Sequence, residues 1–256
     1  MAFELAPLPA FHDNYIWLLT GARSAAVVDP GDAAPVRRAL AERQLTLAAV
    51  LITHHHADHA GGAAALAEQF HCPVFGPAGE TIPAVSHRLK EGQYADIPPL
   101  NARFRVLDIP GHTAGHIAYC GHNIVFCGDT LFSAGCGRLF EGTAAQMSQS
   151  LDKLAMLPDA TALYCGHEYT LANLRFARML EPDNHDIANY AEQAAQQRER
   201  NLPTLPSTLE RERRVNPFLR CRDAALIAAA QHHAKRELRD PIEVFAVIRS
   251  WKDTFT

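Results

Sequence analysis

The chain has 256 residues, with 24 lysine and arginine residues against 28 aspartate and glutamate residues, which gives a formal net charge of −4. This balance argues against a nucleic-acid partner held by bulk positive charge. A hydrophobic fraction of 48% with 20% charged residues excludes a disordered chain.

The sequence also bears on membranes and on cellular compartment. No apolar run approaches the ~20 residues that a membrane helix needs, so we expect no membrane partner. The N-terminal segment lacks a basic region and carries Glu4, which argues against a secretory signal. The six cysteines are scattered without a C-x-x-C pair. This pattern predicts reduced thiols and a cytoplasmic protein.

Up to about residue 170, short apolar runs alternate with turn residues, as is typical of strands joined by tight connections. The run Leu47–Thr53 is continuously apolar, which predicts a strand covered on both faces. The other expected strands are 15–20, 25–28, 104–109, 117–120, 123–127 and 162–165. The expected helices in this part are 36–44, 60–70 and 144–157.

After about residue 170 the pattern becomes helical, and we expect no strand there. Asn184 is a predicted N-cap, and Ser207 with Glu210 forms a predicted capping box. The expected helices are 170–180, 184–200, 207–214, 222–237 and 241–251. The simplest interpretation is a mixed α/β domain over residues 1–168, followed by an α-helical domain over residues 169–256.

The strongest signal is the segment THHHADHAGG, which lies where a buried strand ends and a helix begins. His54 and His56 leave an extended chain on the same side, whereas His55 alternates away and is not expected to be a ligand. Asp58 and His59 follow at the turn. Burying such groups without partners would cost roughly 2–7 kcal/mol each, and a metal ion is a partner that offsets this cost.

Three further residues of ligand type each follow a glycine at the end of an apolar run, namely His112, Asp129 and His167. Glycine permits a tight turn, and sheet folds place ligand sites beyond strand ends. Seven ligands exceed the four or so that one zinc ion takes. We therefore expect two metal sites bridged by Asp129, one with His54, His56 and His112, and the other with Asp58, His59 and His167.

Two neighbouring metal ions can hold a hydroxide between them and lower the pKa of water toward ~7. In this interpretation Asp58 and Asp129 are the catalytic carboxylates, because Asp58 orients the hydroxide and Asp129 bridges the two ions. Nitrogen and oxygen ligands without a thiolate suit zinc, and also iron or manganese.

The pattern H-x-H-x-D-H with a distant His, Asp and His resembles the signature of the metallo-β-lactamase superfamily. The stretches DNYIWLL, VVDPG, PGHTAGH, CGDTLFSAGCGRLFEGTA, CGHEYT and RVNPFLR, with the closing RSWK, resemble glyoxalase II, the hydroxyacylglutathione hydrolases. The resemblance implies an α/β (α+β) fold, a four-layer αββα sandwich followed by a helical C-terminal domain that helps bind glutathione. It implies hydrolysis of S-D-lactoylglutathione to glutathione and D-lactate, the second step of methylglyoxal detoxification. We expect the enzyme to be a monomer.

The resemblance also implies which residues hold the glutathione part of the substrate. Arg249 and Lys252, one helical turn apart, match the family's basic pair at the glycine carboxylate. Arg138 and Tyr169 match residues that contact the peptide. Phe140 stands where some members carry a tyrosine, so a hydroxyl contact is absent here.

The same scaffold allows other functions. The runner-up is a glutathione persulfide dioxygenase with a single iron ion, and the second ligand set argues against it. A structural zinc site is typically closed and rich in cysteine, a β-lactamase would be secreted and lack the helical tail, and a nuclease would need a basic exosite.

Near the ligands, we expect Asp29 to form a turn and His116 to pack or hydrogen-bond.

Overall fold

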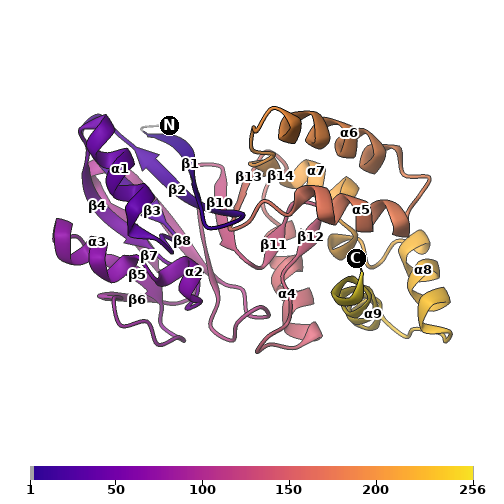
Figure 1. Ribbon diagram of the computed structural model, residues 1–256. Helices are drawn as coiled ribbons and strands as arrows, with labels where there is room; N and C mark the ends of the chain where they lie inside the picture. The colour runs from indigo at the N-terminus through magenta and orange to yellow at the C-terminus, as the bar shows by residue number, and fades with distance from the viewer. Residues whose placement is uncertain (1–2, 256) are drawn as a thin grey trace. The chain divides into compact units, whose positions relative to one another are not determined.

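The computed structural model describes residues 3–255, and these divide into two compact units (Figure 1). Unit 1 contains the described residues up to 108 together with 113–128 and 164–167. Unit 2 contains 109–112, 129–163 and the described residues from 168 onward. Within residues 3–255, none of the helices combines the length and the apolar character needed to cross a membrane.

The first sheet of unit 1 has six strands, which lie side by side in the order of the sequence. Its strands are β1 (Glu4–Ala10), β2 (Asn14–Thr20), β3 (Ser24–Val28), β4 (Thr46–Leu51), β5 (Val74–Pro77) and β6 (His87–Leu89). β1 to β3 pair antiparallel, and β3 to β6 pair parallel. β4 lies between two parallel neighbours, and its consecutive residues Ala49, Val50 and Leu51 are buried, as predicted for a strand covered on both faces.

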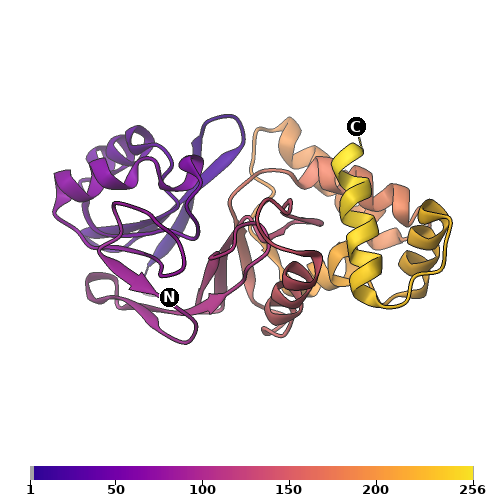
Figure 2. The same ribbon diagram turned by 90° about the horizontal axis from the view of Figure 1, so that it is seen from below.

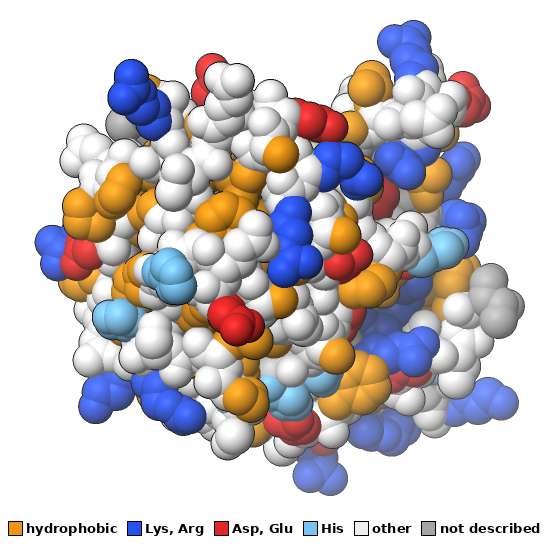
Figure 3. Space-filling model, turned by 60° about the vertical axis from the view of Figure 1, so that its left-hand side comes forward, with side chains coloured by type: hydrophobic (Ala, Val, Ile, Leu, Met, Phe, Trp, Pro, Cys, Tyr) orange, Lys and Arg blue, Asp and Glu red, His pale blue; other side chains and the backbone are white. Residues whose placement is uncertain are grey.

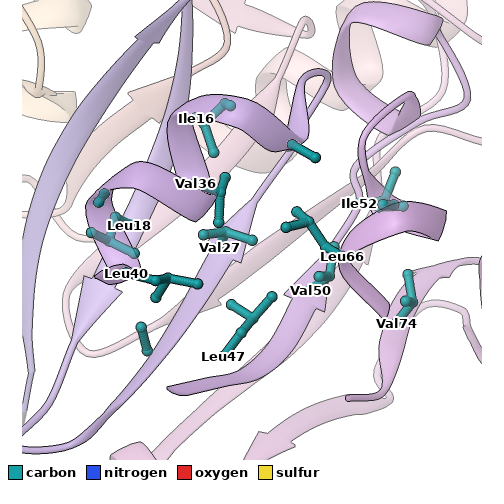
Figure 4. Packing of buried hydrophobic residues seen from close by; sticks show 14 of the residues in the cluster. Ile16, Leu18, Val27, Val36, Leu40, Leu47, Val50, Ile52, Leu66 and Val74 are labelled. Carbon is teal, nitrogen blue, oxygen red and sulfur yellow. The ribbon is translucent and has the colours of Figure 1, made fainter. Parts of the chain in front are cut away.

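The helices α1 (Ala33–Arg43) and α3 (Ala63–Phe70) of unit 1 pack on this sheet through apolar side chains. Unit 1 also contains α2 (Ala57–Ala60) and the short 3-10 helix η1 (Pro98–Leu100). Val36 and Leu40 of α1, four residues apart, and Leu66 of α3 join a buried cluster with Val27 and Val50 of the sheet (Figure 4). Burying a side chain of this size contributes about 1.5–3 kcal/mol.

A second sheet of unit 1 packs against the first through aromatic side chains. It is formed by β7 (Tyr94–Ile97), β8 (Ala102–Asp108), β9 (Ile117–Gly121), β10 (Ile124–Gly128) and the last two residues of β13 (Ala162–Cys165). The Trp17 indole donates to the Cys165 carbonyl at 2.9 Å, and its ring lies 4.8 Å from that of Tyr164. The Tyr119 hydroxyl donates to the Ile52 carbonyl at 3.0 Å. These polar tips are thus satisfied within an otherwise apolar core.

Unit 2 is mainly helical and contains one short hairpin. Its elements are β11 (Leu131–Phe132), β12 (Gly135–Cys136), α4 (Ala144–Ala155), the start of β13, α5 (Thr170–Leu180), α6 (His185–Glu199), β14 (Ser207–Thr208), α7 (Leu209–Val215), η2 (Pro217–Leu219), α8 (Ala224–Ala234) and α9 (Pro241–Thr254). Leu174 of α5 and Ile187 of α6 share a buried cluster with Val215. α8 and α9 lie side by side in both ribbon views (Figure 1 and Figure 2).

The surface carries both signs of charge. On the face shown in Figure 3, acidic side chains lie among basic ones. This mixture agrees with the small net charge of −4. A face without an excess of positive charge does not favour binding of a polyanion such as a nucleic acid.

Several sequence predictions hold closely. β13 and α5 have the predicted bounds, and Asn184 caps α6 by accepting hydrogen bonds from the main-chain N–H groups of Asp186 and Ile187. The structure adds β1, which the sequence analysis did not assign and which contains Pro7 and Pro9. β1 lies at the sheet edge, where a missing N–H breaks no ladder on the open side.

Two predictions for the C-terminal part are wrong. A strand does occur after residue 170, because β14 pairs with the start of β13. The predicted capping box is also wrong, since Thr208 is the N-cap of α7 and accepts a hydrogen bond from the Arg211 N–H. The Ser207 hydroxyl instead donates to the buried carboxylate of Glu212 at 2.5 Å. A buried carboxylate needs donors, and this need decides how the serine is used.

Candidate metal centre

The histidine-rich segment begins where β4 ends, and Asp29 at the end of β3 fixes its start. The two oxygens of Asp29 accept from the main-chain N–H and the hydroxyl of Thr53, both at 2.7 Å. Gly31 follows in the same turn, and a Cβ there would overlap the carbonyl of Asp58. Because β3 and β4 are parallel, the turns that follow them lie at the same edge of the sheet. Asp29 lies in the first of these turns, where the sequence predicts a turn near the ligands.

Three of the predicted ligands meet in unit 1. Asp58, His59 and His167 each offer a ligand atom, and these atoms lie within 4.8 Å of one another. The Nε2 atoms of His59 and His167 are 3.3 Å apart, and Asp58 Oδ2 is 3.5 Å from each. Metal–nitrogen bonds of about 2.0–2.1 Å in a tetrahedron put ligand atoms roughly 3.3 Å apart. The spacing of this donor set therefore fits a zinc-sized ion.

Carboxylates behind the two imidazoles set which ring nitrogen faces the other ligands. Asp13 Oδ1 lies 2.7 Å from His167 Nδ1, and Asp29 Oδ2 lies 3.1 Å from His59 Nδ1. An ionised carboxylate only accepts hydrogen bonds, so each Nδ1 carries the proton and each Nε2 keeps its lone pair. Carboxylate–imidazole pairs of this kind orient metal-binding histidines.

Backbone pairing between the start of β2 and residues 166–167 places His167 beside Asp58 and His59, although these residues are far apart in the sequence. The Tyr15 N–H donates to the Gly166 carbonyl at 2.8 Å, and Asn14 and His167 form an isolated antiparallel bridge. The Asn14 amide also donates to Asp58 Oδ2 at 2.9 Å. Sequence reasoning missed both Asp13 and Asn14, and the available signal was their place at the start of the β2 strand.

His54 and His56 form a second pair in unit 1. His54 Nε2 and His56 Nδ1 are 3.1 Å apart, so their ring nitrogens point to one place, as the alternation predicts. His55 points elsewhere and contacts the Glu80 carboxylate at 3.0 Å. His116 is buried and its ring stacks on that of His54, with centroids 4.5 Å apart and an interplanar angle of 17°. It therefore fixes the plane of a predicted ligand by packing.

The other two predicted ligands lie in unit 2. His112 Nε2 is 3.5 Å from Asp129 Oδ2, and His112 Nδ1 donates to the Arg138 carbonyl at 2.9 Å. Because a carbonyl only accepts, Nε2 again keeps the lone pair and faces the carboxylate. Both side chains are buried. Their spacing matches that of the Asp58 group.

The five predicted substrate residues also lie in unit 2, with very different exposure. Phe140 is 63% exposed and its ring lies 5.2 Å from that of His112. Tyr169 is 36% exposed and packs edge-on against Phe132. Arg249 is only 5% exposed, since it donates to the Cys136 carbonyl at 2.7 Å and to Asp253 at 3.1 Å.

Lys252 lies in a cluster of positive charge. Burial, and then the neighbouring Arg249, Arg175 and Arg138, lower the pKa of its ammonium to about 8. Asp253 is paired with both Arg138 and Arg249. Sequence reasoning missed Arg175, which looks like an ordinary exposed position of α5. Such a concentration of cations suits an anionic ligand.

The Cys136 thiol lies beside Arg249 in this region. Burial raises the pKa of Cys136 to about 11, although Arg249 acts in the opposite direction. The thiol is therefore protonated at neutral pH and behaves as a small apolar side chain.

Comparisons with known proteins agree with this arrangement. Residues 10–167 match the model of the metallo-beta-lactamase superfamily, and residues 168–255 match that of the hydroxyacylglutathione hydrolase C-terminus. Proteins named hydroxyacylglutathione hydrolase from Nitrosomonas eutropha and Aeromonas hydrophila are 53% and 50% identical. These alignments cover 98% and 99% of this chain, and 99% and 100% of the relatives.

Solved structures show the same fold. ETHE1 from Myxococcus xanthus is 26% identical with a TM-score of 0.66, over 98% of both chains. TTHA1623 in a di-iron-bound form is 26% identical with a TM-score of 0.58, over 84% of this chain and 99% of that one. The predicted fold class is confirmed, and the fold together with the His/Asp cluster supports a pair of divalent metal ions. This chain belongs to the hydroxyacylglutathione hydrolases of the metallo-β-lactamase superfamily.

Proposed function

We propose that this chain hydrolyses S-D-lactoylglutathione, and other S-2-hydroxyacylglutathiones, to glutathione and the 2-hydroxy acid. The observation that carries the proposal is the convergence of Asp58, His59 and His167 in a chain about half identical, over nearly its full length, to named hydroxyacylglutathione hydrolases. The chemistry suits a thioester, because a thiolate with a pKa of about 8.5 leaves without a strong general acid.

We propose two divalent ions per chain, with zinc as the native metal. The first is assigned to His54, His56 and His112, the second to Asp58, His59 and His167, with Asp129 between them. The nitrogen and oxygen donors and the short spacings within each unit support this assignment. When bound, such a pair supplies Lewis acidity that lowers the pKa of water toward ~7.

The carboxylates of the chain have distinct parts in this proposal. Asp58 Oδ2 is held by the Asn14 amide, and this hydrogen bond fixes the plane of the carboxylate that orients the attacking water. Asp129 lies against His112 and keeps that imidazole paired. A fixed carboxylate beside the attacking water replaces solvent reorganisation during the reaction.

The basic cluster of unit 2 is assigned to the glutathione carboxylates. We propose that Lys252 binds the glycine carboxylate and that Arg138, whose side chain is exposed, contacts the peptide. Arg249 is buried, and its terminal nitrogens already donate to Cys136 and Asp253. We therefore propose that it attracts the glycine carboxylate through its positive charge and not through a direct hydrogen bond. Tyr169 and Phe140 are assigned to the peptide through their exposed rings.

We also propose that the enzyme is a monomer and works in the cytoplasm. The support for the compartment is chemical, since none of the six cysteines, all of which lie in the described residues, is joined in a disulfide, as in proteins of reducing compartments. Light scattering after size exclusion and fractionation of the native host test these two points.

The experiment is hydrolysis of S-D-lactoylglutathione, followed at the thioester absorbance, with metal analysis of the same purified sample. We expect turnover and two metal ions per chain. Asp58→Asn keeps the size of the side chain and removes its charge, and it should lower kcat by 10²-fold or more. Asp96→Asn, at an exposed pair with Arg103, is the matched control.

The competing function has a different signature. A persulfide dioxygenase would consume oxygen in the presence of glutathione persulfide and would bind one iron ion. A metal-replete sample that consumes oxygen and leaves every glutathione thioester intact would overturn the proposal.

A further inference from the structure

A fully buried carboxylate that the proposed chemistry does not use lies beneath the hairpin β11–β12. Glu212 Oε1 accepts from the hydroxyls of Ser133 at 2.8 Å and Ser207 at 2.5 Å. Its Oε2 accepts from the Ala134 N–H at 2.7 Å and the Asn216 amide at 3.0 Å. Four donors therefore surround a group that only accepts. This match offsets the cost of burying the charge.

The hairpin itself has little pairing of its own, because each strand has only two residues. Side chains from elsewhere in unit 2 bind its backbone instead. The Asn216 amide donates to two of its carbonyls, both at 3.0 Å, and Asn173 and Arg249 each donate to one more, at 3.0 and 2.7 Å. The accepting carbonyls belong to Phe132, Ser133, Gly135 and Cys136.

The two ends of this hairpin reach the predicted ligands of unit 2. Asp129 precedes it, and the Gly137 N–H closes it by donating to the Thr130 carbonyl at 3.2 Å. A Cβ at Gly137 would overlap the carbonyl of Asp129, so the two ends are in close contact. The next residue, Arg138, supplies the carbonyl that holds His112 Nδ1. A shift of the hairpin therefore moves both ligands.

We propose that Glu212 and Asn216 are positioning residues that hold the hairpin, and through it Asp129 and His112, in the geometry that binds metal. This inference rests on the proposed function only in taking Asp129 and His112 as metal ligands. Glu212 accepts from the Ala134 N–H and Asn216 donates to the Phe132 carbonyl, so both residues act on Asp129 and His112 through the backbone of the hairpin.

Two substitutions at Glu212 separate positioning from charge. In Glu212→Gln the amide oxygen can still accept from Ala134 and Asn216, and the amide nitrogen can donate to the hydroxyls of Ser133 and Ser207 after they rotate. Glu212→Ala leaves all four donors without the carboxylate. Glu210→Ala, at an exposed position of the same helix, is the matched control.

The readout is zinc affinity, measured on the full-length metal-free protein by competition with a chromophoric chelator. Loss of a group that orients a metal ligand typically lowers affinity 10–100-fold. We expect a loss of this size at one of the two sites in Glu212→Ala, and a change of less than a few-fold in Glu212→Gln and Glu210→Ala. Melting of each variant in excess chelator reports the stability of the fold without metal.

If Glu212→Ala does not fold, Ser207→Ala removes one donor to the carboxylate and should give a smaller loss of zinc affinity. A folded Glu212→Ala with wild-type affinity at both sites would overturn the inference. So would Glu212→Gln with the same loss as Glu212→Ala, because the retained hydrogen-bond geometry should rescue binding. A wild-type protein that binds two zinc ions but leaves thioesters intact would overturn the proposed function alone.

Discussion

Asp13 and His167 are joined by a hydrogen bond of 2.7 Å between Oδ1 and Nδ1, although 154 residues separate them in the chain. The carboxylate fixes the tautomer, so that Nε2 of His167 faces His59 and Asp58. The side chain of Asp13 is 27% exposed, and that of His167 only 6%. The tertiary fold, and not the segment CGH, thus decides which nitrogen of His167 is available.

Asp13→Ala should weaken metal binding without unfolding the protein. The imidazole of His167 loses its acceptor and can rotate or adopt the other tautomer, and losses of this kind typically lower metal affinity 10–100-fold. Asp13→Asn keeps an acceptor oxygen and should lose less. Zinc competition with a chelator measures the effect, and equal affinities for Asp13→Ala and the wild type would contradict it.

The predicted ligands could be found from the sequence because each follows the end of an apolar run. Strand ends meet at one edge of a sheet, so His54, His56, Asp58 and His59 were predictable as a group. Their partners were not, because Asp13 and Asn14 reach them only through the pairing of the β2 start with residues 166–167. A single sequence carries no signal for contacts of this separation.

The fold shows the same division between local and tertiary information. Helices with a clear cap, such as His185–Glu199 with its N-cap Asn184, were predicted within a residue. β1 was missed because its prolines are tolerated only at an edge, and an edge is a property of the sheet. Ser207 was misassigned because its hydroxyl serves the buried Glu212, which local capping rules do not consider.

Arg249→Met should lower stability as well as substrate binding. Arg249 is buried and donates to Cys136 and Asp253, and hydrogen bonds of a charged group contribute about 1.5–3 kcal/mol each. We therefore expect a clear fall in the free energy of unfolding, measured in urea. Arg222→Met breaks only an exposed pair with Asp152 and should cost at most about 1 kcal/mol. Equal stabilities of the two variants would contradict the prediction.

Lys252 should make substrate binding dependent on pH. The pKa of its ammonium is lowered to about 8, chiefly by burial, so the charge is lost as the pH rises through 8. We expect KM for S-D-lactoylglutathione to rise above pH 8 with a smaller change in kcat. Lys252→Met should have a raised KM that no longer shows this step, whereas Lys90→Met, at an exposed position, should behave as the wild type. A KM that stays flat between pH 7 and pH 9 in the wild type would exclude this role.

The same pKa shift predicts a trend in stability. Between a folded pKa of about 8 and the ordinary value of 10.5, the unfolded chain binds more protons at this lysine than the folded chain. The contribution of Lys252 to the free energy of unfolding therefore rises with pH over this range and is constant below it. The measurement is the free energy of unfolding in urea at pH 7.5 and at pH 9.5. Between these two pH values it should change more favourably in the wild type than in Lys252→Met, which lacks the contribution of this lysine.

Gly31→Ala should disturb the ligand loop. A Cβ at Gly31 would overlap the main-chain carbonyl of Asp58, and a backbone atom cannot move aside as a flexible side chain can. The loop must shift, and the side chain of Asp58 must shift with it. Its Oδ2 atom lies 3.5 Å from Nε2 of both His59 and His167. We expect reduced metal content and a lower melting temperature. Gly92→Ala is the matched control, because its φ of +81° is unfavourable for alanine but nothing lies within 4 Å of the added atom. Gly92→Ala should therefore lose some stability and keep its metal, and a Gly31→Ala protein with full metal content would show that the loop tolerates the shift.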